Sequence, residues 1–163
     1  MRERRKLRLR AEDSEDLAVV AALLQDARAP LSEMAFDPTG GRFMASFVRY
    51  MRECQPDPRI REGLCEIASA VIFEGIQSVR YRGLDPHDLA CELRLLTIAT
   101  APGRERLVDI DLLFDGGAVI RLATDRIRCR LEDHGEPRGC TVPPTDHFAE
   151  EPSEDLDAPS GPA

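Results

Sequence analysis

Hydrophobic and polar residues alternate along much of the chain between residues 7 and 131. Leu7 and Leu9 alternate with Arg8 and Arg10, and Val79 and Tyr81 alternate with arginines in the same way. A period of two residues predicts strands that bury one face. Similar runs predict strands at 34–36, 42–48, about 64–73, 76–82, 107–114, 118–122 and 126–131. The glycine pairs at 40–41 and 116–117 predict hairpin turns between neighbouring strands.

The chain contains an internal repeat with an offset of 72 residues, which aligns residues 7–18 with residues 79–90. Each copy begins with a short alternating strand and continues with aspartates that suit a helix N-cap and the third helical position. The first cap is Asp13 and the second is Asp85. Leucine spacing after each cap predicts a helix. The first helix is expected to bury Leu17, Val20, Ala21 and Leu24, and the second Leu89, Leu93 and Leu96.

Together these elements predict an α+β fold. Two β-α-β-β pseudo-repeats, at about residues 6–50 and 78–131, would form a mostly antiparallel sheet with two helices packed on it. One domain is expected over residues 6–140, after a basic N-terminal extension at 1–5 and with a loop at 55–58. Residues 141–163 hold six acidic residues, no basic residue and five prolines. That composition predicts a disordered acidic tail.

Charge and cysteine usage narrow the class of protein. The 163 residues include 22 basic and 30 acidic side chains, giving a net charge of -8. No apolar run is long enough to cross a bilayer, and the basic start is followed by acids rather than by the apolar region of a signal peptide. The five cysteines form no C-x-x-C pair. We therefore expect a cytoplasmic protein with reduced thiols and no membrane partner.

The sequence predicts no catalytic residue, no metal site and no cofactor. It has neither a glycine-rich phosphate loop nor a G-x-S-x-G nucleophile motif. Cys129, His134, Cys140 and His147 do not follow a zinc-ligand spacing. Four aspartates are of a residue type that catalysis uses, but helix capping explains all of them: Asp13, Asp16, Asp85 and Asp88.

Arginines alternate with apolar residues on several predicted strands. If these strands were neighbours, their polar faces would form a guanidinium surface suited to carboxylates or phosphates. The alternative, which the sequence favours, is a solvated sheet face with arginines paired to Asp109, Asp111, Glu132 or Asp133. Only eight aromatic residues are present and none is a tryptophan, so we do not expect nucleic-acid binding. The candidate ligand-binding residues are Arg80, Arg82, Arg126, Arg128 and Arg130.

Several stretches resemble the bacterial family of domain-of-unknown-function proteins called DUF2948. They are residues 7–18 with 23–27, 34–36, 79–85 and the ending 120–137, which together span about residues 6–137. The sequence departs from the family pattern at Ser46–Tyr50, where the family tends to have an Asn-Arg-Phe-Arg-Trp-like strand. It also has Arg138 where a tryptophan usually follows Gly-Glu-Pro. The resemblance implies no activity, cofactor or site residue.

The leading functional hypothesis is a non-enzymatic accessory or protein-interaction domain, because no nucleophile, base or metal set converges. Its partner would be another protein or a second copy of the chain. The alternative is a domain that binds a small anionic ligand or metabolite through the arginine-rich sheet face. A third hypothesis is an enzyme subunit that is inactive alone.

Overall fold

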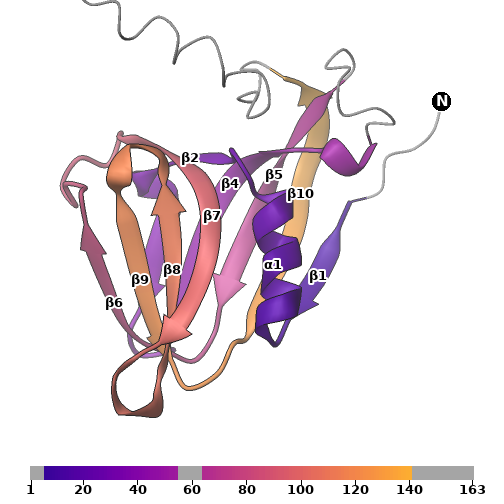
Figure 1. Cartoon of the computed structure of the whole chain (residues 1–163). Coiled ribbons are helices and arrows are strands. Elements are labelled where there is room, and N and C mark those ends of the chain that lie inside the picture. Colours follow the sequence, from indigo (N-terminus) through magenta and orange to yellow (C-terminus); the bar gives the residue numbers. More distant parts are fainter. Residues whose placement is uncertain (1–5, 55–63, 141–163) are drawn as a thin grey trace, which may run out of the picture.

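The computed structural model describes residues 6–54 and 64–140 of the chain (Figure 1). The predicted N-terminal extension at 1–5, the loop at 55–58 and the acidic tail at 141–163 lie outside these residues. The described part contains ten strands and a single α-helix, with four short 3-10 turns. The strands are β1 (Arg8–Ala11), β2 (Arg28–Pro30), β3 (Met34–Asp37), β4 (Arg42–Tyr50), β5 (Cys65–Phe73), β6 (Ile76–Arg82), β7 (Glu92–Pro102), β8 (Val108–Phe114), β9 (Val119–Thr124) and β10 (Cys129–Gly139).

Nine of these strands follow one another through hydrogen-bonded neighbours in the order β1-β10-β5-β4-β2-β7-β8-β9-β6, and β3 pairs with β4. Every pairing is antiparallel. The short β2 joins two groups of long strands by pairing with β4 on one side and with β7 on the other. The first strands of the two predicted repeats, β1 and β6, therefore lie at opposite ends of the strand order.

The core lies between these two groups of strands and is continuous. On β4, Phe43, Ala45 and Phe47 are buried while the intervening residues are less so, as a period of two requires. Phe43 pairs in register with Phe73 on β5, and their rings lie 6.5 Å apart. Ile110, on β8 in the other group of strands, belongs to the same core cluster. The turn from β5 to β6 requires Gly75, whose φ is 71°.

The α-helix α1 (Ser14–Leu23) confirms the first predicted helix and its cap. The Asp13 side chain accepts a hydrogen bond of 2.8 Å from the Asp16 backbone N–H, which satisfies one of the free donors at the helix start. Leu17, Val20 and Ala21 are buried. Figure 1 shows α1 between β1 and β7, where it covers the core. Among the helices of the described residues, none has the length and apolar composition of a membrane span.

The second predicted helix does not form, so the prediction of an α+β fold with two packed helices is wrong. The Asp85 carboxylate accepts from the backbone N–H of His87 and closes a local turn instead of capping a helix. The following leucines alternate as on a strand: Leu93 and Leu95 are buried in β7, whereas Leu96 is 38% exposed. The described residues form a mostly antiparallel β structure with one helix.

The other strand predictions agree with the structure except at the last strand. The runs predicted at about 64–73 and 76–82 are β5 and β6, and the predicted glycine turns join β3 to β4 and β8 to β9. The run predicted at 126–131 is displaced, because β10 begins at Cys129 and continues to Gly139. Before it, the chain bends: the Arg126 carbonyl accepts from the Thr124 hydroxyl, and the Arg128 carbonyl accepts from the Glu74 N–H.

Candidate functional site

The five arginines predicted from the sequence fall into two separate groups. Arg80 and Arg82 lie on β6, the last strand of the sheet path. Arg126 lies in the bend before β10, and Arg128 and Arg130 flank the first residue of β10. Because β10 is the second strand from the opposite end, strand pairing does not join the two groups into one face.

Arg128 and Arg130 line a hollow of about 370 Å³ that also contains carboxylates, and Arg126 is not part of its lining. Arg10 is paired in register with Arg130, which brings two guanidinium groups to this hollow. However, Arg130 lies 3.3 Å from Glu74 and 3.6 Å from Glu132, and Arg128 lies 3.4 Å from Asp125. Charge pairing of this kind matches the solvated-face alternative and leaves little net positive charge for a small anion.

The thiol beside this hollow is not a nucleophile at neutral pH. Cys129 is 3% exposed, and burial raises the pKa of its thiol to about 12. The reactive form of cysteine is the thiolate, which is scarce at neutral pH when the pKa is so high.

The arginines on β6 differ from Arg128 and Arg130 in their ion pairing. Among the described residues, neither Arg80 nor Arg82 has an ion pair, and both are exposed. With Tyr81, Val119 and Arg121 they line a shallow hollow of about 240 Å³. Arg121 is engaged, because its guanidinium donates to both carboxylate oxygens of Asp111 at 2.7 and 2.9 Å. These bonds raise the pKa of Arg121. Arg80 and Arg82 are thus the cations of this face that remain open to a ligand.

The opposite face of β6 borders an apolar groove of about 220 Å³ between β3 and β6. Tyr81 and Leu89 on its lining are 52% and 56% exposed, although both are large apolar residues. An exposed apolar surface of this kind is typical of an interaction site. The groove is lined mainly by Leu31, Met34, Phe36, Val79, Tyr81, Leu84 and Leu89.

The backbone of β6 is open along one side. The strand pairs with β9, and its only other backbone hydrogen bond within the described chain joins the Ile76 N–H to the Gly41 carbonyl at 2.8 Å. From residue 77 to residue 82, the N–H and C=O groups that point away from β9 have no backbone partner within the described chain. Such groups can pair with an added strand. We call this outer side of residues 77–82, with the groove on one face and Arg80 and Arg82 on the other, the β6 edge.

Sequence reasoning found only part of the β6 edge. The alternation at 79–82 correctly placed the arginines opposite Val79 and Tyr81. The alternation does not reveal the groove, because leucine spacing predicts that Leu89 is buried in a helix, and because Met34 and Phe36 come from a hairpin distant in the sequence. The available signal was Tyr81 itself, an aromatic residue in a short strand with few apolar neighbours.

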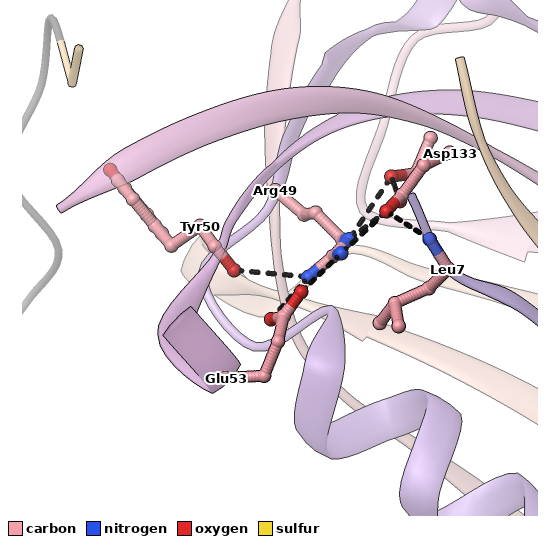
Figure 2. A network of polar contacts seen from close by, with 6 residues as sticks. Leu7, Arg49, Tyr50, Glu53 and Asp133 are labelled. Carbon is pink, nitrogen blue, oxygen red and sulfur yellow. Dashed lines mark hydrogen bonds and ion pairs between the residues drawn. The ribbon is translucent and has the colours of Figure 1, made fainter. Parts of the chain in front are cut away.

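A buried ion-pair network lies at the end of the core between β4, β5 and β10. Arg49 is fully buried, and its guanidinium donates to Asp133 at 2.7 and 2.8 Å and to Glu53 at 2.8 and 2.9 Å. Figure 2 shows Arg49 reaching between these two carboxylates. Asp133 also accepts from the Ser69 hydroxyl and, at 2.8 Å, from the Leu7 N–H. The network ties the entry of the first strand to β4 and β10.

The geometry of this network indicates a structural role, because the Arg49 guanidinium is closed to solvent and all its N–H donors face protein acceptors. Burial alone would raise the pKa of Asp133, but hydrogen bonds from Arg49 and Ser69 hold it below its usual value. At Arg49, burial alone would lower the pKa, but the hydrogen bonds to Asp133 and Glu53 outweigh it and raise the pKa. The sequence suggested Asp133 as a partner of surface arginines, whereas the structure pairs it with an arginine on the core face.

This network predicts a loss of stability in acid. Because the pKa of Asp133 is lower in the folded than in the unfolded chain, its stabilising effect is fully present above the ordinary carboxylate range near pH ~4. It is lost as the pH falls through the lower, folded value. Unfolding free energies from urea titrations between pH 7 and 3 should therefore decline more steeply for the wild type than for Arg49→Met/Asp133→Leu. Equal slopes would contradict this assignment.

A second polar cluster, also missed by the sequence, lies where β2, β4 and β5 meet. Glu66 is fully buried and contacts Arg28 at 2.6 Å and Arg138 at 3.0 Å. The guanidinium groups of Arg28 and Arg52 lie 5.9 and 5.5 Å from the centre of the Tyr50 ring. Burial raises the pKa of the Tyr50 hydroxyl above its ordinary value. The cluster joins strands through compensated charges.

Comparison with known proteins adds a family and no function. Across residues 6–54 and 64–140, no three His, Cys, Asp or Glu side chains gather as metal ligands would. Comparison with curated proteins and with solved structures found no match. The model of the family described as "Protein of unknown function (DUF2948)" matches residues 7–146, which is most of the chain. The chain therefore belongs to the DUF2948 family.

Proposed function

We propose that the protein is a protein-interaction domain that binds an extended segment of a partner along the β6 edge. The observation that carries this proposal is the position of an unpaired strand side next to an exposed apolar groove. An added strand would form main-chain hydrogen bonds with residues 77–82, and its side chains would fill the groove. The groove borders the core, where Phe43 and Ile120 are buried, but Tyr81 and Leu89 on its lining are exposed.

Two features favour peptide binding over simple surface exposure. Proteins protect free edges with short strands, charged side chains, bulges or a covering segment. β6 carries two arginines and a register shift between Ile76 and Ser78, but it is seven residues long, and its outer side from residue 77 to residue 82 has no backbone partner among the described residues. Exposed apolar side chains scattered singly would have no meaning, but Tyr81 and Leu89 line one groove. Small-anion binding by Arg126, Arg128 and Arg130 stays a prediction, which the neighbouring carboxylates weaken.

The test uses the full chain and synthetic nine-residue peptides in which valine alternates with a polar residue. We expect saturable binding by fluorescence anisotropy, with slower amide hydrogen exchange in residues 77–82. Tyr81→Ser should weaken binding about tenfold, because truncating a groove aromatic removes roughly 1–2 kcal/mol of contact. Val19→Ser is the matched control, since Val19 on α1 is 54% exposed and does not line the groove. If no such peptide slows exchange in β6, the proposal is wrong.

A further inference from the structure

We infer that the β6 edge selects an extended peptide in which apolar residues alternate with acidic residues. The inference rests on the proposed function and specifies the chemistry of its ligand. Its basis is that the two faces of β6 differ: the groove side is apolar, and the other side presents two arginines without ion pairs among the described residues.

The alternation follows from strand geometry. A strand added beside β6 continues the pleat of the sheet, so its successive side chains point to opposite faces. Every second side chain would lie beside Val79 and Tyr81, over the groove. The side chains between them would lie beside Arg80 and Arg82. Directly opposed and diagonal cross-strand pairs are close enough to interact.

Charge determines which polar residues fit between the apolar ones. Arg121 pairs across the ladder with Arg80, but Asp111 and Asp109 neutralise it, at 2.7 and 3.7 Å. No carboxylate of the described residues does so for Arg80 or Arg82, and an exposed arginine binds a carboxylate through a planar fork. Glutamate or aspartate in the added strand would therefore be favoured, and lysine would be repelled.

The same charges argue against a second copy of the chain as the occupant. If two β6 strands paired with each other, Arg80 and Arg82 of one copy would approach the same arginines of the other. Like charges opposite or diagonal to each other destabilise a strand pair. A partner segment of opposite charge satisfies both faces.

The experiment compares three valine-alternating peptides with glutamate, serine or lysine at the polar positions. Binding is measured by anisotropy at low salt with the full chain, and the bound strand is located by hydrogen exchange. We expect the glutamate peptide to bind at least about tenfold more tightly than the lysine peptide, with a preference that shrinks as salt rises. Arg80→Glu/Arg82→Glu should reverse the preference. Arg104→Glu/Arg106→Glu, which changes the net charge equally at exposed arginines that line neither the groove nor the hollow beside Arg80 and Arg82, should leave it unchanged.

Each outcome decides between the two proposals. If the serine and lysine peptides bind as tightly as the glutamate peptide and slow exchange in residues 77–82, the acidic specificity is wrong and the peptide-binding function stands. If no peptide of any charge slows exchange there, the function itself is wrong. If exchange in β6 slows with protein concentration alone and sedimentation shows a dimer, a second copy occupies the edge and the inference is overturned. A preference that the matched control abolishes equally would also overturn it.

Discussion

Replacing Arg49 by methionine should destabilise the protein by about 3–5 kcal/mol. The guanidinium of Arg49 is fully buried and compensates Asp133, whose side chain is also closed to solvent. Methionine fills a similar volume but leaves the carboxylate of Asp133 without its cationic partner. Removing one member of a buried ion pair is costly mainly because the remaining charge is left uncompensated.

Urea unfolding followed by circular dichroism measures this loss. Arg42→Met on the same strand is the matched control, because Arg42 is exposed and has no ion pair among the described residues. It should change the free energy of unfolding by less than about 0.5 kcal/mol. Arg49→Met/Asp133→Leu should recover part of the loss, since both buried charges are then gone, although the Ser69 hydroxyl and the Leu7 N–H lose their acceptor. Equal costs for Arg49→Met and Arg42→Met would show that the buried pair contributes nothing.

The second large effect concerns β7, where the structure and the sequence pattern disagree. Leu95→Asp should cost more than about 4 kcal/mol, because Leu95 is fully buried and the new carboxylate would find neither water nor a cation. Leu96→Asp should cost less than about 1 kcal/mol, since Leu96 is 38% exposed on the other face. Thermal and urea unfolding of both variants provide the comparison.

The pair of variants also separates the two interpretations of this segment. In the helix predicted from spacing, Leu93 and Leu96 share the buried stripe and Leu95 lies off it. In the strand, Leu93 and Leu95 share the buried face. A larger loss for Leu96→Asp than for Leu95→Asp would favour the helix and contradict the structure.

One part of the β6 edge can be predicted from the sequence, and another part cannot. Period-two alternation at 79–82 sufficed to place Arg80 and Arg82 on one side and Tyr81 on the other, because the direction of side chains in a strand is a local property. That β6 lies at the end of the strand order, with an unpaired outer side, depends on all the other pairings. The grouping of these arginines with those near β10 was an assumption about neighbours that the strand order does not support.

What the sequence by itself determined is therefore local. The cap at Asp13, the helix after it, the glycine turns and most strands follow from short-range stereochemistry and periodicity. The same local rules predict a helix at residues 85–96. The structure has a turn and the beginning of β7 there instead, because hydrogen bonds to distant residues hold this segment. The backbone N–H groups of Leu31 and Ser32 donate to the carbonyls of Cys91 and Leu89, and Leu95 exchanges bonds with residues 26 and 27.

Only the tertiary structure decided which strands are neighbours, and with that the buried partner of Arg49 and the open side of β6. Arg49 and Asp133 are 84 positions apart in the chain, and no local pattern links them. Pairings over such distances are selected by the burial of a shared core, which depends on the whole set of strands. Local patterns establish the direction of a side chain, whereas the packing of the complete sheet determines what that side chain meets.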